Sequence, residues 1–248
     1  MSPEDRFVRE LEHLRRDGDA AAQCLYSWLA FHHYAGANKK TRLALNRTPL
    51  FWNTGLGALQ ATLFIALGRI FDTDPRNHTI DRLLREAAEN RQIFSKPSLA
   101  ARKKAQSPGA TWIRDYVRDA YVPTDQDFKR LSGYVKRKRT IYRKTYGHIR
   151  HKVFAHNALG SAEKKNELFS KTEIGELQRL VLSIRAFHEA LWQLYFNGRR
   201  PAIKVGAYSV RSMKKDMASV PINAPVEQRI FAETCEALTL VTTGTQRK

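Results

Sequence analysis

The 248-residue chain carries 43 Lys and Arg residues against 24 Asp and Glu residues, which gives a formal net charge of +19 at pH 7. Hydrophobic residues make up 42% of the chain and charged residues 27%. That is enough apolar mass for a packed core, so the composition excludes a wholly disordered basic tail. The excess of positive charge indicates a polyanionic partner.

The sequence also indicates the cellular compartment and whether the chain spans a membrane. Cys24 and Cys235 are too few for a disulfide framework, and residues 1–16 are charged rather than apolar, so we expect no signal peptide. The longest apolar run, residues 56–68, is interrupted by polar residues and is shorter than the roughly 20 residues of a membrane span. We therefore expect a cytoplasmic protein with no membrane partner.

Helical patterns occupy the N-terminal third. Ser2 is a predicted N-cap, with Pro3 in the first turn, of a helix that extends to about residue 35 and breaks or bends at residues 17–19. A polar loop is expected over residues 36–47. The scattered apolar positions of residues 48–72 predict a long core helix that is buried on most sides.

The remaining elements follow in chain order. A turn and a short amphipathic helix are expected over residues 74–89, and then a less regular connection over residues 95–123 with one or two short helices. Thr124 is the predicted N-cap of a helix that continues around residue 150 and ends at Gly160. Ser170 and Glu173 predict a capping box for a helix that ends at Gly198.

The pattern changes after Pro201. Residues 202–210 fit an extended segment, and residues 225–240 fit a final helix. No run alternates long enough to support a sheet, so the sequence predicts an all-α fold. We expect a helical domain over residues 1–198 and a C-terminal extension of unknown role over residues 199–248.

Positive charge is concentrated in mid-chain. Residues 96–152 hold sixteen Lys or Arg and four Asp, with no Glu, and therefore carry +12. The densest part is interleaved with Tyr134, Tyr142 and Tyr146, and cations beside aromatic rings suit RNA or single strands. A solvated helix face is the plain alternative. The predicted RNA-binding residues are Lys136, Arg137, Lys138, Arg139, Arg143 and Lys144.

Residues 150–157 read Arg-His-Lys-Val-Phe-Ala-His-Asn, with a histidine after five residues that follow the arginine. This segment resembles the signature of the HEPN superfamily, which is Arg, then Asn, Asp or His, then a His after four to six intervening residues. Together with Leu-Gly-Arg-Ile-Phe-Asp at 67–72, it is similar to the AbiU-type abortive-infection branch over roughly residues 1–196. The resemblance implies a helical bundle and metal-independent RNA cleavage at a site shared by two protomers.

Arg150 and His156 are the predicted catalytic residues. A histidine moves protons at neutral pH, and an arginine grips phosphate oxygens with a planar, permanently charged fork. A capping or core role for His156 near a helix end, and plain membership of the basic stretch for Arg150, stay open. Supporting roles are assigned to His151, Lys152, Asn157, Arg69 and Asp72. For the last two, three apart on one helix, a structural ion pair is the favoured interpretation.

The spacing of the two catalytic candidates limits how they can act. Six residues turn a regular helix by about 600°, so Arg150 and His156 would project about 120° apart. Either the helix is distorted near Arg150 or a second protomer completes the site, and the resemblance favours the second protomer.

The sequence therefore predicts an endoribonuclease of antiphage or toxin type. We expect RNA as its substrate, a homodimer as its active form, a cognate antitoxin or defence partner, and no metal or cofactor. His32-His33 and the later histidines lack Cys or carboxylate neighbours at ligand spacing. The competing hypothesis is a non-catalytic RNA-binding or interaction module with the same fold.

Overall fold

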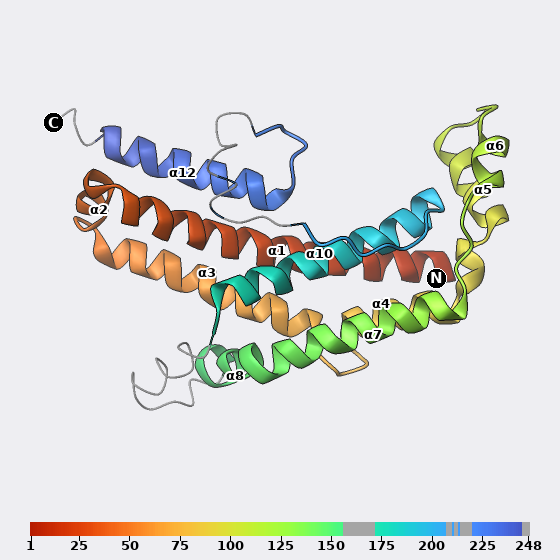
Figure 1. The fold of residues 1–248 in the computed structure, drawn as a ribbon, viewed down its shortest axis with the longest axis horizontal. Coiled ribbons are helices and arrows are strands. Elements are labelled where there is room, and N and C mark those ends of the chain that lie inside the picture. Colours follow the sequence, from red (N-terminus) through yellow and green to blue (C-terminus); the bar gives the residue numbers. More distant parts are fainter. Residues whose placement is uncertain (156–171, 207–209, 211–212, 214–219, 245–248) are drawn as a thin grey trace.

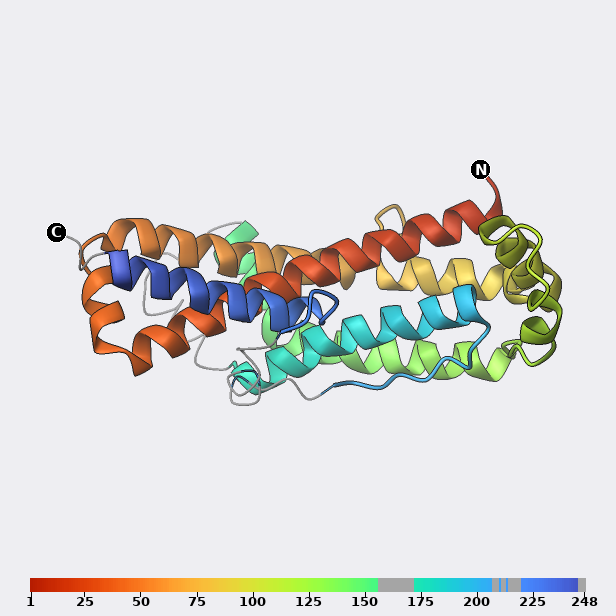
Figure 2. The ribbon, with the colours of Figure 1, turned by 90° about the horizontal axis from the view of Figure 1, so that it is seen from above.

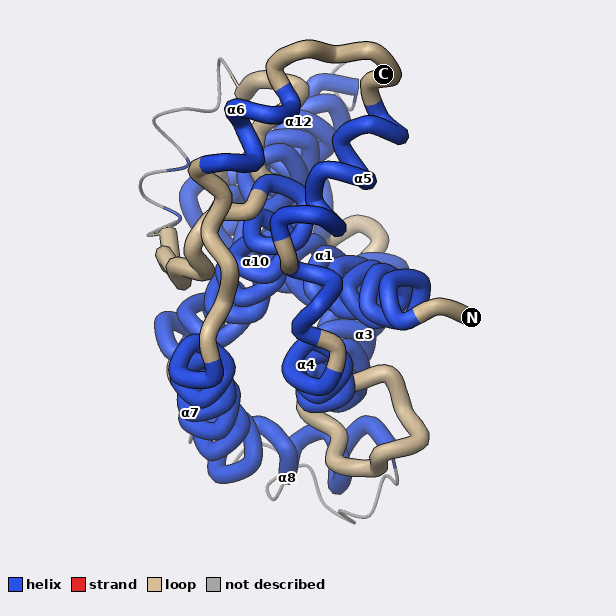
Figure 3. Tube along the Cα trace, turned by 90° about the vertical axis from the view of Figure 1, so that its right-hand side faces the viewer, coloured by secondary structure: helices blue, strands red, loops and turns tan. Residues whose placement is uncertain are grey.

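The computed structural model describes residues 1–155, 172–206, 210, 213 and 220–244. Over these residues the chain is helical and contains no strand, so the predicted all-α class is confirmed. The long helices lie roughly along one axis and give an elongated bundle (Figures 1 and 2). Seen end-on in Figure 3, α1 and α10 lie near the middle, with α4 and α7 on one side and α12 on the other.

The first helix, α1 (Pro3–Ala37), begins as predicted at a Ser2 capping box and then continues without a break. The predicted break at residues 17–19 is wrong. Gly18 is buried inside α1, and a Cβ placed on it would lie 3.4 Å from Cγ2 of Ile184 on α10 (Ile174–Asn197). The glycine is therefore packed against α10 and does not end α1.

Residues 36–47 are not the predicted polar loop. The side chain of Asn38 accepts a hydrogen bond from the Thr41 backbone N–H and caps the short helix α2 (Lys39–Leu45). This helix connects α1 to α3 (Pro49–Ile70) at one end of the bundle (Figure 1). An asparagine cap is a local signal for the start of a helix, but it is hard to recognise within a stretch of other polar residues.

The predicted long apolar helix is α3, but it is buried over only part of its length. Its buried residues all lie between Leu63 and Ile70, whereas Leu50 is 81% and Phe51 69% exposed. The expected burial on most sides is therefore wrong for the first half. By length and composition α3 could cross a membrane, but its second half is part of the hydrophobic core.

The next elements cover the far end of the bundle. The predicted short amphipathic helix is α4 (Ile80–Glu89), which Thr79 caps, and the 3-10 turn η1 (Arg91–Phe94) follows it. The connection predicted over residues 95–123 holds two short helices, α5 (Lys96–Gln106) and α6 (Ile113–Arg118). They enclose a small second cluster of Leu99, Ile113 and Val117.

The helix predicted from Thr124 changes its winding near its end. Thr124 forms a capping box with Asp127 and starts α7 (Asp125–Ile141). Two wider π-helical turns follow, η2 (Tyr142–Tyr146) and η3 (Arg150–Ala155), separated by the single α-turn α8 (Gly147–Ile149). The helix is thus distorted on both sides of Arg150, and π-turns of this kind are frequent at functional sites. Gly160 lies outside the described residues.

The C-terminal part packs on the same core. The predicted Ser170 capping box is wrong as the start of α10, because Glu173 is its N-cap, and Ser170 itself lies outside the described residues. The helix ends as predicted at Gly198, which has a φ of 57°. The predicted last helix is α12 (Val226–Gly244).

The helix α12 lies along α1 (Figure 1). Tyr34 and Thr239 share a hydrogen bond of 2.7 Å, and Phe231 and Cys235 belong to the main core. The boundary at residues 198 and 199 stays a prediction. So does an extended segment over 202–210, since residues 207–209 lie outside the described part.

Candidate functional site

The side chain of Arg150 lies over Gly68, near the end of α3. A Cβ placed on Gly68 would be 2.2 Å from Nε, 2.4 Å from Cδ and 2.9 Å from Cζ of Arg150. Any larger residue would occupy the space that the arginine fills. The two blocks that carried the sequence resemblance, residues 67–72 and 150–157, therefore meet at this point.

Asp72 lies just after α3 and is held by its own loop. Its Oδ1 accepts hydrogen bonds from the backbone N–H groups of Thr73 (2.7 Å) and Asp74 (3.1 Å), and its Oδ2 accepts one from Nδ2 of Asn77 (3.0 Å). Burial alone would raise the pKa of Asp72. These hydrogen bonds outweigh it, and with the nearby charge of Arg150 they lower the pKa below its usual value.

Tyr142 is the third member of this cluster. Its ring is buried and stacks on Phe71, with ring centroids 5.2 Å apart. The pKa of Tyr142 is raised to about 12, mainly by burial; the charge of Arg150 opposes this increase, and the Asp72 carboxylate adds to it. Tyr142 thus forms an apolar wall beside two interacting charges.

The predicted ion pair between Arg69 and Asp72 is wrong. Nη1 of Arg69 lies 3.7 Å from Oδ1 of Asp17 on α1, and the arginine side chain is 64% exposed. Asp72 faces its own loop and the charge of Arg150 instead. Of the two residues, Asp72 is therefore the one that the fold brings to Arg150.

The other predicted site residues are described only in part. His151 is exposed and belongs to η3. Lys152 also belongs to η3, but its side chain lies outside the described part, as do His156 and Asn157. The pairing of His156 with Arg150 therefore stays a prediction.

The predicted RNA-binding cations divide into two groups. Four are exposed on α7 and η2, namely Lys136, Arg137, Arg143 and Lys144. The other two are built into the bundle. Arg139 forms an ion pair with Asp81 on α4, and burial lowers the pKa of Lys138, whose Nζ lies 5.4 Å from the Tyr134 ring centroid.

The tyrosines of the basic stretch face inward. Tyr142 and Tyr146 are buried, and the Tyr146 hydroxyl donates to the Glu173 carbonyl (3.2 Å) and to Oε2 of Glu176 (3.0 Å). Tyr134 is half-buried and donates to the Ser183 carbonyl at 3.4 Å. The expected use of these rings as stacking platforms is wrong, because they form the core side of the helix whose outer side is basic.

Sequence analysis missed two residues of the cluster. Gly68 had a usable signal, since a glycine inside a helix is unfavourable relative to alanine and its presence can have a packing or functional reason. Tyr142 was assigned to RNA stacking because its burial depends on Phe71, which a linear pattern does not reveal. Gly68 and Tyr142 define the space around the Arg150 side chain and carry no charge.

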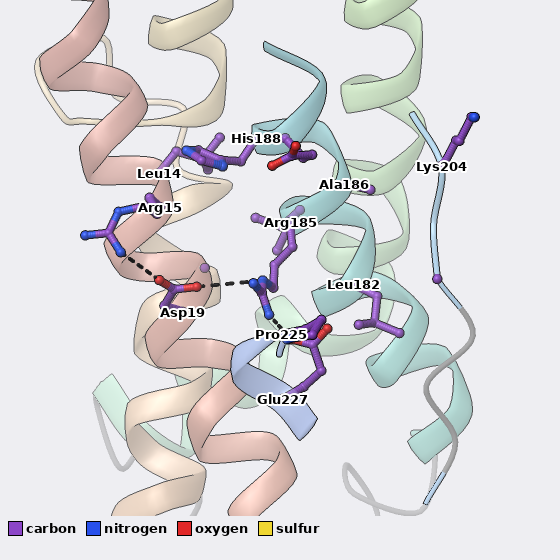
Figure 4. Close-up of a pocket in the computed structure, with 14 residues that line it drawn as sticks. Leu14, Arg15, Asp19, Leu182, Arg185, Ala186, His188, Lys204, Pro225 and Glu227 are labelled. Carbon is purple, nitrogen blue, oxygen red and sulfur yellow. Dashed lines mark hydrogen bonds and ion pairs between the residues drawn. The ribbon is translucent and has the colours of Figure 1, made fainter. Parts of the chain in front are cut away.

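A cavity of about 480 Å³ lies elsewhere, between α1, α10 and the start of α12 (Figure 4). Arg185 lies at its centre, where it forms an ion pair with the buried Glu227, and its Nε is 3.7 Å from Oδ1 of Asp19. Nη1 of Arg15 is 3.0 Å from Oδ2 of the same aspartate. These charges balance one another and join three helices, which is a structural role.

Metal ligands are scarce in the part of the chain that the structure describes. It contains no group of three or more His, Cys, Asp or Glu residues placed to hold a metal ion. Glu10, His78 and Arg82 do meet, with Nδ1 of His78 2.8 Å and Nε of Arg82 3.0 Å from the buried Glu10 carboxylate. This cluster connects α1 to α4 and its preceding loop.

Comparison with known families gives one finding. The family model described as AbiU2, of the HEPN group, matches residues 4–214. No curated protein and no solved structure gives a match. The matched region contains both α3 and the Arg150 segment, and it ends before α12.

Proposed function

Because the chain belongs to the HEPN AbiU2 family, we propose that it is an endoribonuclease of abortive-infection type that cleaves RNA without a metal ion. The observation that carries the proposal is the position of Arg150. Its side chain lies over Gly68, its charge acts on Asp72 and Tyr142, and the helix that presents it is distorted on both sides. An arginine oriented by shape and by charge is suited to bind a phosphate.

The chemistry needs few groups, because RNA carries its own nucleophile. The 2′-hydroxyl attacks the adjacent phosphorus, the bond from phosphorus to the 5′-oxygen breaks, and a 2′,3′-cyclic phosphate and a 5′-hydroxyl result. In our proposal His156 takes the proton of the 2′-hydroxyl or returns one to the leaving 5′-oxygen. Arg150 stabilises the negative charge that develops on the phosphate oxygens.

The exposed cations supply a path for the RNA backbone. Lys136, Arg137, Arg143 and Lys144 are exposed along the helical run that leads to Arg150. Lysines and arginines bind phosphates whatever the base sequence, and their affinity falls as salt rises. We propose that RNA lies along this surface and that the four residues position the strand while Arg150 acts on one phosphate.

Cleavage of total RNA in EDTA tests the proposal. The wild-type protein should produce fragments that end in a 2′,3′-cyclic phosphate, and Arg150→Ala and His156→Ala should each lower the rate about 100- to 10,000-fold. Arg114→Ala removes an exposed arginine of α6 and is the matched control. Cleavage that persists in both variants, or that EDTA abolishes, would contradict the proposal.

The proposed active form is a homodimer in which two Arg150 segments meet. The spacing of Arg150 and His156 required either a distorted helix or a second protomer. Because residues 150–155 form a π-helical turn, the helix is distorted, and the homodimer needs a test of its own. If each site uses Arg150 of one protomer and His156 of the other, a mixture of the two inactive variants should regain activity after subunit exchange. Full activity in a monomer, measured by light scattering, would contradict the shared site.

One observation favours a second candidate function, a non-catalytic RNA-binding module. The exposed cations of α7 and η2 would bind RNA even with no cleavage chemistry. Such a module would bind RNA with the same salt dependence but would release it intact. The cleavage assay with Arg150→Ala and His156→Ala therefore distinguishes the two.

A further inference from the structure

The end of the bundle formed by α2 and the start of α3 is apolar, basic and exposed. Leu43 is 57%, Leu50 81% and Phe51 69% exposed. We call this surface the apolar tip and define it by these three residues and Trp52. It lies opposite the end that carries α5 and α6 (Figures 1 and 2).

Aromatic rings support the apolar tip from behind. The half-buried Trp52 ring contacts Phe51, at a centroid distance of 5.1 Å, and Phe31 of α1, at 5.5 Å. The end of α12 extends the surface, because Thr242 is hydrogen-bonded to Thr41 at 2.9 Å and Leu240 is 64% exposed. Exposed apolar residues clustered in this way mark an interaction surface.

In α2, in α3 and in the segment between them, every charged residue is basic. No Asp or Glu occurs between Ala20 and Phe71. Four basic residues around the tip are exposed, and none has an acidic partner among the described residues: Lys39, Lys40, Arg42 and Arg47. A basic collar around exposed Leu and Phe side chains is the pattern of a surface that enters the headgroup region of an anionic bilayer.

We propose that the apolar tip docks this protein on an anionic lipid surface, with Leu50 and Phe51 inserted and the basic collar at the headgroups. Leu43 and Leu50 offer an RNA strand neither stacking nor hydrogen bonds, and of the two rings at the tip only Phe51 is largely exposed, so the tip fits lipid better than RNA. A second copy fits less well, because a two-fold contact would place basic collars together with no acid between residues 20 and 71 to pair with them. This proposal replaces the expectation of no membrane partner, which rested on the lack of an apolar run long enough to span a membrane.

Vesicle sedimentation tests the insertion of apolar side chains. The full chain is mixed with vesicles of phosphatidylcholine and phosphatidylglycerol at three to one, and with pure phosphatidylcholine as the neutral reference. Leu50→Glu with Phe51→Glu should lower partitioning onto the anionic vesicles at least about tenfold. Ile222→Glu with Val205→Glu is the matched control, because it adds the same two charges at exposed residues outside the apolar tip, and it should change partitioning less than about threefold.

The collar is tested separately, since a chain of net charge +19 adsorbs to anionic vesicles without any special surface. Lys40→Gln with Arg47→Gln should weaken partitioning roughly 20- to 30-fold, at about fivefold for each cation. Lys104→Gln with Arg114→Gln removes the same charge from the opposite end. Equal losses in the two double variants would overturn the proposal.

Depth quenching decides between insertion and adsorption. Lipids brominated on their acyl chains should quench the fluorescence of Trp52, so Trp52→Phe should remove most of the quenching and Trp112→Phe should retain it. Salt-reversible binding without quenching of Trp52 would overturn the proposal. So would a dimer that Leu50→Glu with Phe51→Glu converts to monomers, or RNA binding that falls in this variant while vesicle binding stays unchanged.

Discussion

The two halves of α3 belong to one apolar helix but differ in how far they are covered. The second half, from Leu63 to Ile70, packs in the core and ends beside Arg150. The first half, from Pro49 to Thr62, has no buried residue. Hydropathy therefore shows that a helix is apolar but does not show what covers it. The second half of α3 contributes to the candidate site, and the first half contributes to the apolar tip.

The contrast extends to the glycines of α3. Gly55 and Gly57 have no heavy atom within 4 Å of a Cβ placed on them, whereas Gly68 would place its Cβ against Arg150. No acidic residue occurs in α3 itself. The first carboxylate after it is that of Asp72, at the end of the helix that faces Arg150. Substitutions made in pairs, one in each half, can therefore separate the two roles.

The largest expected difference concerns stability. Leu67 is fully buried in the main core, so Leu67→Ala should lower the free energy of unfolding by about 2–5 kcal/mol through lost burial and the cavity that remains. Leu50→Ala removes an exposed side chain and should change it by less than about 0.5 kcal/mol. Urea denaturation of both variants measures the difference, and similar losses would show that the first half is covered in solution.

The next difference concerns activity. Gly68→Ala should displace the side chain of Arg150, which can move at little cost to the fold, and RNA cleavage should fall roughly 10- to 100-fold. The melting temperature should stay close to that of the wild type. A Gly68→Ala protein with full activity would mean that the position of Arg150 over the glycine is not the one that acts on RNA.

Much of the fold was predictable because its signals are local. Ser2, Thr79, Thr124 and Gly198 each occupy the helix end that their own side chain or backbone favours. The errors arose where a tertiary neighbour decides the outcome. Gly18 reads as a helix break until Ile184 is placed against it.

The candidate site shows the same limit. The resemblance identified residues 67–72 and 150–157 together, but not which members touch. Arg69 and Asp72 share a helical spacing, yet Asp17 on α1 competes for Arg69 and the loop after α3 holds Asp72. Side-chain partners between segments 82 residues apart depend on packing, which local periodicity does not encode.

A smaller effect is expected from Asp72→Asn. The lowered pKa of Asp72 means that its ionised form stabilises the folded state at pH values above its unfolded pKa of about 3.9, and that this contribution disappears as the pH falls through the lower folded value. Asp72→Asn should therefore reduce stability at pH 7 and leave it nearly unchanged in strong acid. Denaturation at both pH values measures this, and a pH-independent loss would contradict an electrostatic role.

The same variant has a spectroscopic consequence at Tyr142. Because the Asp72 carboxylate helps to raise the pKa of Tyr142 to about 12, Asp72→Asn should lower that pKa, whereas Arg150→Ala should raise it. Titration of ring-labelled tyrosine by NMR measures both shifts. Shifts of the same sign in the two variants would contradict the proposed interaction among the three residues.

The smallest expected effect lies in the exposed half of α3. Gly57 has a negative φ within a helix, and nothing opposes a Cβ there, so Gly57→Ala should stabilise the protein by about 0.5–1 kcal/mol through the lower conformational entropy of the unfolded chain. Gly68→Ala has the same intrinsic gain, but displacement of Arg150 offsets it. The free energy of unfolding, measured by urea denaturation, should therefore be higher for Gly57→Ala than for the wild type, and equal to or lower than the wild type for Gly68→Ala. A loss of stability in Gly57→Ala would mean that a neighbour occupies the space beside the first half of α3, which would remove the basis for an exposed apolar tip.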